Sequence, residues 1–380
     1  MTTPTTQLTQ VRVEGFRSIK DATVDLGPIN VLIGPNGSGK SNLLTALRLP
    51  SIMRAQGLRL FVGKEGGASR LLHYGAETTK EFEIDLTFTE DSERWGSERW
   101  GYEARLGQRA GESLVFVKEL LSLESDRRDG AWLDIGKGHL ESQMARAQGW
   151  PHTLSRVEQL VGGMGFFHFH NTSSTSPLRQ NARQADSKYL HSDGSNLAAL
   201  LYRLKRSAGE DARVSWSLLE GLVRRVAPFI KTLDPDLVDP DNPDASSVRL
   251  HWTDERNHRF DAHDLSDGTL RSIALFAALT QPPSTRPAFI TIDEPELGLH
   301  PAAISLFAAL VRSASAHSQI LLATQSPALL DEFATDEIVV VERAGGETSF
   351  TRLDPKQLEA WLEDYSLSEL YDKNVLGGRP

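Results

Sequence analysis

The stretch from Gly34 to Ser41 constrains this chain more than any other. It matches the phosphate-binding pattern G-x-x-x-x-G-K-[S/T] at every fixed position. The apolar residues 29–33 before it predict a buried strand, and residues 41–49 after it predict a helix. The backbone N–H groups of the loop and the N-terminus of the helix would then face one phosphate. The predicted contact residues are Gly34, Pro35, Asn36, Gly37, Ser38, Gly39, Lys40, Ser41 and Asn42.

Three side chains near this loop have predicted roles. Lys40 would reach the β- and γ-phosphates of ATP, and the Ser41 hydroxyl would be a ligand of Mg²⁺. Arg17, near the end of an early predicted strand, is a candidate for nucleotide contact, and a solvated strand edge is the alternative. The loop therefore predicts ATP and Mg²⁺ as ligands.

A second pattern is an apolar strand, Phe289–Ile292, that ends in two carboxylates, Asp293 and Glu294. In an open α/β sheet, ligands lie at the carboxyl ends of the strands, so we expect this pair beside the phosphate loop. Mg²⁺ prefers oxygen ligands and keeps several waters, so Asp293 is predicted to hold it through water. Glu294 is predicted to orient or deprotonate the attacking water.

Hydrophobic periodicity predicts an α/β protein with an inserted middle. From residue 265 on, helices at 268–280 and 302–313 alternate with apolar strands, which indicates a mixed or parallel core sheet. Before that, a period-two strand at 82–88 and later runs predict an antiparallel β lobe and a helical lobe. The later predicted elements are strands 102–106, 113–121 and 166–171, helices 140–162, 193–206 and 214–233, and a hairpin of 248–252 with 259–261. The predicted domains are an ATPase core of 1–90 and 262–380 and an insertion of 91–261.

Composition narrows the class of protein. Hydrophobic residues make up 39% of the 380 residues and charged residues 24%, which is typical of a globular chain. The chain has no cysteine, which excludes disulfides and thiolate metal sites and fits a reducing compartment. Residues 1–10 show no apolar secretory segment, and no apolar run approaches a membrane span of about 20 residues, so we expect a cytoplasmic protein without membrane contact. The net charge of −10 argues against tight non-specific binding of nucleic acid.

Further motifs, taken together, resemble the ABC-type ATPases of the RecF/SMC-like branch, in the group called AAA-family or predicted ATPases. The similar segments are Val13–Ser18, Ser38–Asn42, the signature Leu265–Arg271, the block Asp293–Pro301, Ala323–Pro327 and the ending Leu367–Pro380. The resemblance is strong at the two ends of the chain and loose in the middle. It implies a P-loop NTPase fold with an ABC-ATPase-like head; no coiled coil and no toprim domain are expected.

The resemblance also implies a homodimer that closes head to tail on two ATP molecules. Ser266 and Gly268 of one subunit would contact the γ-phosphate held by the other, and the segment 296–300 would line the seam. The family usually has a histidine after Thr324 that senses the γ-phosphate, and this chain has Gln325. An amide hydrogen-bonds a phosphate but carries no proton, so slow hydrolysis is expected. Asp267 replaces the usual glycine of the signature; it would cap the helix or, turned inward, repel phosphate.

Three further sets of residues have weaker predictions. His168 and His170 share one face of a predicted strand, and we expect core or nucleotide-adjacent histidines there rather than a metal site. Gln180 and Gln184 are candidates for the family's magnesium-sensing glutamine. Basic residues form two clusters, for which a solvated surface is favoured over a DNA- or partner-facing patch. These clusters are Arg179, Arg183 and Lys188, and then Arg203, Lys205 and Arg206.

The leading functional hypothesis is an ATP-hydrolysing switch that acts on DNA or on a separate nuclease or effector, in DNA repair, genome maintenance or defence against phage. A non-catalytic ATP-gated scaffold is the alternative, and Glu294 argues against it because a dead site needs no base. A P-loop small-molecule kinase would leave the Ser266 signature unexplained. A transporter subunit fits less well because of the long inserted region.

Overall fold

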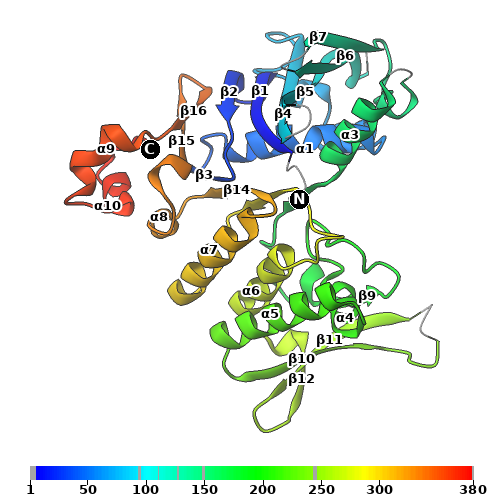
Figure 1. Ribbon diagram of the computed structural model, residues 1–380, viewed down its shortest axis with the longest axis vertical. Coiled ribbons are helices and arrows are strands. Elements are labelled where there is room, and N and C mark those ends of the chain that lie inside the picture. The colour runs from blue at the N-terminus through cyan, green and yellow to red at the C-terminus, as the bar shows by residue number, and fades with distance from the viewer. Residues whose placement is uncertain are drawn as a thin grey trace. The chain divides into compact units, whose positions relative to one another are not determined.

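The computed structural model describes residues 6–92, 96–109, 111–125, 128–147, 150–242 and 246–378. Residues 1–5 and the last two residues of the ending Leu367–Pro380 therefore lie outside the described residues. The chain divides into two compact units. The terminal unit comprises Met1–Met164 and Ala334–Pro380, and the central unit comprises Gly165–Phe333 (Figure 1).

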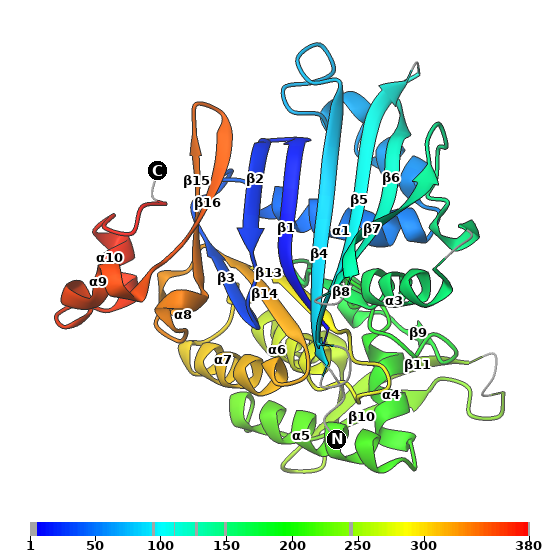
Figure 2. The same cartoon turned by 45° about the horizontal axis from the view of Figure 1, so that its top comes forward.

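The terminal unit contains a six-stranded antiparallel sheet in the order β2-β1-β4-β5-β6-β7. Its strands alternate as the sequence predicts: Phe82, Ile84, Leu86 and Phe88 are buried on one face. Helices α1 and α3 contact each other and contact strands β1 and β5, and Figure 2 shows α1 crossing these strands. The bounds are β1 Gln7–Phe16, β2 Ile19–Asp25, β4 Glu81–Ser92, β5 Gly96–Arg109, β6 Ser113–Ser125, β7 Arg128–Gly136, α1 Lys40–Arg54, α2 Leu58–Lys64 and α3 Pro151–Gly162.

The phosphate loop belongs to a second strand group of the same unit. β3 (Ile29–Ile33) is fully buried and runs parallel to β15 (Ile338–Ala344), which pairs antiparallel with β16 (Glu347–Arg352). β3 leads directly into residues 34–39, and α1 begins at Lys40, so the strand, loop and helix follow in the predicted order. The C-terminal helices are α9 Pro355–Leu362 and α10 Leu367–Asp372.

The central unit combines a parallel strand pair, a helical layer and a small antiparallel sheet. β13 (Phe289–Asp293) pairs in parallel with β14 (Gln319–Thr324). Helices α4 to α7 contact one another, and α4 and α5 contact the small sheet of β10, β11 and β12, with β9 on β11 (Figure 1). The other bounds are β8 Met164–Phe167, β9 Ala182–Arg183, α4 Leu197–Arg206, α5 Glu210–Val226, β10 Ile230–Leu237, β11 Ser247–Asp254, β12 Arg259–Asp261, α6 Asp267–Leu279, α7 Pro301–Ser315 and α8 Pro327–Leu330.

Two predicted elements of the central unit are wrong at their ends. The helix predicted to run to residue 233 ends at Val226, because Pro228 disfavours helical backbone in the residue before it. The following residues form β10 instead, and Pro235 is tolerated there because β10 lies at the edge of its sheet. The strand predicted for 166–171 ends at Phe167, so His168 and His170 lie beyond it.

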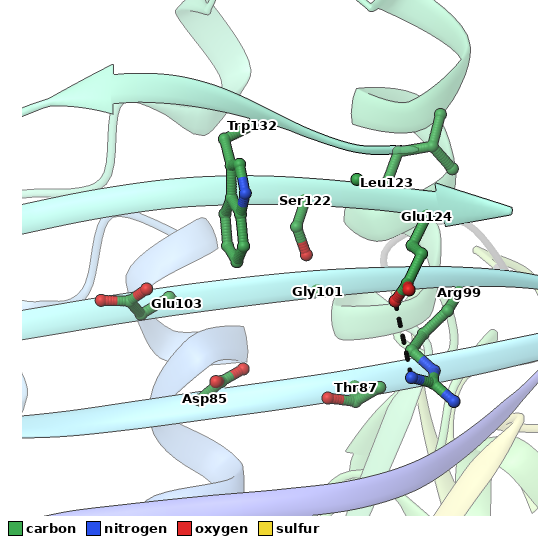
Figure 3. A pocket seen from close by; sticks show the side chains of 10 residues that line it. Asp85, Thr87, Arg99, Gly101, Glu103, Ser122, Leu123, Glu124 and Trp132 are labelled. Carbon is green, nitrogen blue, oxygen red and sulfur yellow. Dashed lines mark hydrogen bonds and ion pairs between the residues drawn. The ribbon is translucent and has the colours of Figure 1, made fainter. Parts of the chain in front are cut away.

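A carboxylate of the terminal sheet gives a pH-dependent prediction. Asp85 lies in a pocket of about 190 Å³, and Figure 3 shows it with Glu103 and Trp132 on three different strands around that pocket. Burial, followed by the charges of Glu103 and Glu83, raises the pKa of Asp85 from 3.8 to about 6. Because the folded state binds this proton more tightly than the unfolded state, the stabilisation from protonated Asp85 is complete below about pH 4 and is lost as the pH rises through about 6.

Asp85→Asn is therefore expected to raise the free energy of unfolding at pH 7–8 by about 2–3 kcal/mol, since a pKa change of one unit corresponds to 1.36 kcal/mol. Urea unfolding from pH 4 to pH 8 measures the difference, which should vanish at the acidic end. Glu124→Gln is the matched control, because Glu124 lines the same pocket and pairs with Arg99 in an exposed position. An unchanged pH profile in Asp85→Asn would contradict the prediction.

Candidate nucleotide site

The backbone of the phosphate loop explains two of its glycines. A Cβ on Gly34 would lie 2.2 Å from the carbonyl oxygen of Val341, so strand β15 leaves no room for a side chain. Gly39 has φ +116°, which L side chains rarely adopt, and a Cβ there would lie 2.3 Å from Thr348 Oγ1. The close packing against β15 and β16 therefore fixes the loop before any ligand binds.

The polar groups of the loop fit a phosphate. Ser38 Oγ is buried and has no hydrogen-bond partner among the residues that the structure describes. Lys40 is 6% exposed, and its Nζ donates to the carbonyl oxygens of Gly34 at 2.6 Å and Pro35 at 3.0 Å. A buried hydroxyl without a partner is costly, and a phosphate oxygen would satisfy it. The residues present therefore fit ATP, and the exposed Ser41 at the start of α1 fits its predicted role as a Mg²⁺ ligand.

A hydrogen-bond network ties the predicted candidate Arg17 to this loop. Arg17 has φ 49° and donates to Asn42 Oδ1 at 3.4 Å and to Glu65. Asn42 donates to Ser18 Oγ at 2.7 Å. Thr348 Oγ1 lies 2.7 Å from the same Ser18 Oγ and 2.8 Å from the carbonyl oxygen of Ser38. Arg17 is thus held toward α1 rather than at a solvated strand edge, although its contact with nucleotide stays a prediction.

The carboxylates of the second pattern lie at the end of β13, as predicted. Glu294 has a left-handed backbone with φ 46°, which is unfavourable for a glutamate. Gln325 Nε2 donates a hydrogen bond to Glu294 Oε1, and His170 Nε2 lies 3.6 Å from Glu294 Oε2. Glu294 is therefore held in a defined position by two neighbours.

Glu296 connects the same turn to the end of β14. Its Oε1 accepts hydrogen bonds from Thr324 Oγ1 at 2.6 Å and from the backbone N–H of Gln325 at 3.2 Å. His300 Nδ1 then accepts from the N–H of Ala302 and caps α7. The turn after β13 is thus anchored at both ends.

The signature segment begins helix α6. Ser266 is the N-cap, is exposed, and its Oγ accepts from the N–H of Thr269 at 3.2 Å. Asp267 Oδ1 accepts from Arg179 Nη2 at 2.7 Å, so this acid pairs with an arginine of the same unit. A Cβ on Gly268 would lie 2.4 Å from the carbonyl oxygen of Gly298, which is a packing reason for glycine that sequence reasoning missed.

Arg271 is a further residue whose role the sequence did not reveal. It is 5% exposed, and its guanidinium donates to the carbonyl oxygens of Phe169 at 2.8 Å, His170 at 2.9 Å and Leu297. Burial lowers the pKa of Arg271, and the charges of Asp267 and Glu294 oppose that effect. One side chain thus joins the signature helix to the histidine segment and to the turn after β13.

Arg271→Ala is expected to destabilise the protein by about 2–4 kcal/mol, because it leaves three carbonyl acceptors without their donor. Urea unfolding would measure this loss. Arg271→Lys should recover only part of it, since an ammonium lacks the planar fork of a guanidinium. Arg225→Ala, at an exposed site on α5, is the control, and a loss as small as in that control would contradict the prediction.

Two predictions about polar clusters need correction, the one for Arg179 and the one for core histidines. Arg179 is buried and donates to Thr172, Ala262 and Leu265 carbonyl oxygens, so it cannot belong to a surface patch. Lys205 and Arg206 pair with Asp234 and Asp236, which offsets the positive charge of the second cluster. His168 and His170 are not core residues, because their side chains are 57% and 28% exposed, and the alternative that they lie next to the nucleotide stays a prediction. Gln180 and Gln184 lie outside the contacts described above, and their role stays a prediction.

Comparison of the sequence with known protein families identifies the family of this chain. Residues 29–331 match the model of the family described as "AAA domain, putative AbiEii toxin, Type IV TA system". The chain belongs to this AAA domain family. None of the curated proteins matches this chain in sequence.

Solved structures show the same fold. An Smc head bound to the C-winged helix domain of ScpA superposes with a TM-score of 0.59 and 13% identity, over 93% of this chain and 99% of that chain. The Smc head with an extended coiled coil from Pyrococcus furiosus, bound to the C-terminal domain of ScpA, gives 0.57 and 14%, over 94% and 99%. This chain therefore has the predicted P-loop NTPase fold of the ABC-type, RecF/SMC-like branch. Among the helices that the structure describes, none has the length and apolar character that crossing a bilayer requires.

Proposed function

We propose that the chain is an ATP-hydrolysing switch that closes head to tail as a homodimer around ATP. The observation that carries the proposal is the position of Glu294, which Gln325 and His170 hold in a left-handed conformation at the end of β13. A strained backbone persists only where surrounding contacts enforce it, and such residues cluster at functional sites. A non-catalytic scaffold gives no reason for a carboxylate held in this way.

The roles of the residues follow from their chemistry. Lys40 and the backbone N–H groups of residues 36–39 bind the phosphates. Glu294 orients and deprotonates the attacking water, and Gln325 fixes Glu294 by donating to its Oε1. Ser41 and Asp293 would hold Mg²⁺, which neutralises charge on the phosphates when it is bound. Because Gln325 is an amide and cannot titrate, it positions Glu294 without exchanging a proton.

The exposed start of α6 supports the dimer. Ser266 is exposed, and its Oγ and the first turn of α6 form an N-terminus of the kind that binds anions. Asp267 pairs with Arg179, so its charge is partly neutralised and the repulsion of a phosphate is reduced. Leu297 is 45% exposed in the segment that we propose for the dimer seam.

We propose a protein effector or DNA as the target of the motion, in genome maintenance or in defence against phage. The pairing of Lys205 and Arg206 with aspartates and the net charge of −10 favour a protein over DNA. The Smc heads with this fold were solved with a domain of ScpA bound, which is a precedent for a protein partner.

A mixing experiment tests the shared site. Lys40→Ala removes the phosphate-binding ammonium, and Ser266→Arg blocks the surface offered to the partner, so each variant alone should lose ATP turnover. In a head-to-tail dimer, a mixed pair contains one site with both residues intact. An equal mixture of the two variants should therefore recover about a quarter of the wild-type rate, because half of the dimers are mixed and each has one working site of two.

Two measurements keep this test decisive. Ser313→Arg, at an exposed serine on α7, should leave turnover unchanged and so controls for the added charge. Circular dichroism of each variant establishes that it is folded. If both variants are folded and the mixture stays as inactive as its components, the shared site of the head-to-tail dimer is refuted.

A further inference from the structure

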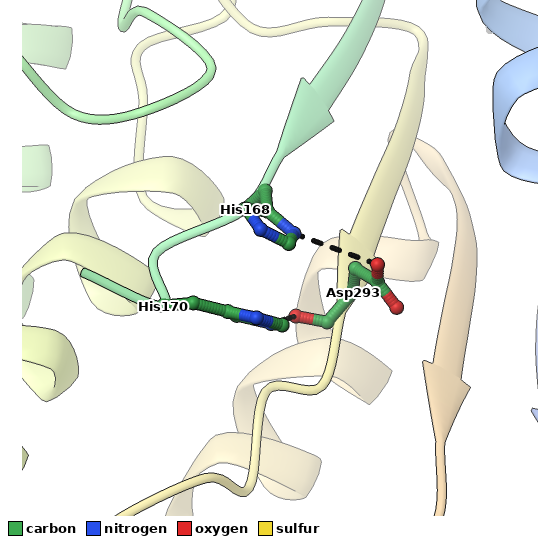
Figure 4. A group of neighbouring side chains, drawn as sticks. All are labelled: His168, His170 and Asp293. Carbon is green, nitrogen blue, oxygen red and sulfur yellow. Dashed lines mark hydrogen bonds and ion pairs between the residues drawn. The ribbon is translucent and has the colours of Figure 1, made fainter. Parts of the chain in front are cut away.

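Two histidines and an aspartate of the central unit converge at one point. His168 and His170 follow β8, and Asp293 ends β13 (Figure 4). The two histidines therefore belong to one segment, and Asp293 lies more than 120 positions further along the chain. His168 Nδ1 lies 3.5 Å from Asp293 Oδ2. One ligand atom from each residue lies within 4.8 Å of the other two. This proximity could not be read from the sequence.

These separations suit a coordinated metal ion. With metal–ligand distances of about 2.0–2.2 Å, neighbouring ligand atoms of a tetrahedral site lie about 3.3–3.6 Å apart. The His168–Asp293 distance already has this value. The rings of His168 and His170 are stacked with their centroids 3.7 Å apart, so the two imidazoles lie side by side next to Asp293.

The backbone around the histidines is fixed. The N–H of His168 donates to the carbonyl oxygen of Ser192 at 2.8 Å. Arg271 donates to the carbonyl oxygens of Phe169 and His170, and His170 Nε2 lies 3.2 Å from the carbonyl oxygen of Asp293. A site that is already ordered loses little conformational entropy when an ion binds. The nearby carboxylate of Glu294, 3.6 Å from His170, adds negative charge that favours a cation.

We infer that His168, His170 and Asp293 form a binding site for a divalent transition-metal ion of the Zn²⁺ class. Imidazole ligands favour such ions over Mg²⁺ and Ca²⁺, which take oxygen ligands. Solvent or another donor would complete the coordination. The site deepens the proposed function, because its ion and Mg²⁺ compete for Asp293; only this competition rests on the proposed ATPase role.

Cobalt provides a direct readout of the site. Co²⁺ is titrated into tag-free protein without nucleotide, and the visible ligand-field absorption is followed. One equivalent of Co²⁺ should bind, and one equivalent of Zn²⁺ should displace it. His168→Ala and His170→Ala should each weaken binding by at least about tenfold, because losing even an outer-shell partner of a metal site costs 10–100-fold in affinity.

His317→Ala is the matched control, since His317 is an exposed histidine of the same unit. His168 is also exposed, so its variant should fold, and thermal unfolding without metal establishes that. Absorption that is unchanged in both histidine variants, or no binding at one equivalent, would overturn the site. Because nucleotide is absent from the titration, its outcome is independent of whether the mixing experiment supports the ATP switch.

The competition has its own test. Zn²⁺ at one equivalent should lower ATP turnover of the wild-type protein with Mg²⁺ present, and excess Mg²⁺ should restore it. The inhibition should require a concentration of Zn²⁺ at least about tenfold higher in His168→Ala, in parallel with the loss of Co²⁺ affinity. Equal inhibition of the two proteins would refute the competition for Asp293.

Discussion

Glu294→Gln is expected to lower the rate of ATP turnover by at least about 100-fold, because a positioned general base contributes about 10²–10⁴ to a rate. The amide keeps the size of the side chain, so binding of ATP should persist. The variant should therefore accumulate in the ATP-bound state and elute in gel filtration with ATP and Mg²⁺ as a dimer. Steady-state phosphate release measures the rate, and light scattering on the column measures the mass.

The structure offers a matched control for this substitution. Glu332 lies in the same unit and accepts a hydrogen bond from Ser305 of α7, and it has no proposed role in the nucleotide site, so Glu332→Gln should turn over ATP like the wild type. Gln325→Ala separates positioning from chemistry, since it removes the donor to Glu294 and leaves the carboxylate in place. Its rate should fall between those of the wild type and Glu294→Gln. Wild-type phosphate release by Glu294→Gln would contradict the proposed role of Glu294.

Lys40→Ala is expected to weaken ATP binding by about 10–100-fold, which corresponds to the 1.5–3 kcal/mol of a hydrogen bond to a charged group. Lys40 is buried in the loop and donates to two loop carbonyl oxygens, so binding exchanges these bonds for bonds to phosphate. Titration with a fluorescent ATP analogue measures the affinity.

Two further variants sharpen the interpretation of this loss. Lys20→Ala removes an exposed lysine that pairs with Glu347 in the same unit, and its ATP affinity should equal that of the wild type. Lys40→Arg keeps the charge, but its larger planar head does not fit the buried position, so it should restore binding only in part. ATP affinity in Lys40→Ala equal to that in Lys20→Ala would show that the loop does not bind the phosphates through Lys40.

The network around Thr348 links two distant parts of the terminal unit to one loop. Thr348 donates a hydrogen bond to the carbonyl oxygen of Ser38, and its side chain lies where a Cβ on Gly39 would otherwise fit. Thr348 is more than 300 positions further along the chain than these residues. Arg17 reaches the same network through Asn42 and Ser18. The phosphate loop is therefore supported by residues from both ends of the chain.

Local sequence patterns determined the elements that carry the site. Each of these elements is a stretch of contiguous residues, because glycine geometry, hydrophobic periodicity and capping act over a few positions. They are the loop at Gly34–Ser41, the strand that leads into Asp293 and Glu294, and the helix start at Ser266. The family resemblance that these motifs carry is confirmed for the fold. The division into a core of 1–90 and 262–380 with an insertion of 91–261, and the joint action of Lys40 and Glu294, stay predictions.

Only the tertiary structure decided which polar groups meet. Arg179 neutralises Asp267 across 88 positions, Arg271 joins three carbonyl oxygens, and His168 meets Asp293 although no acid lies near it in sequence. Such pairings have no local signal, because a buried charge can find its partner on any element that packs against it. The sequence thus determined the presence and type of the elements that carry the proposed site, and the packing of distant segments determined their electrostatic surroundings.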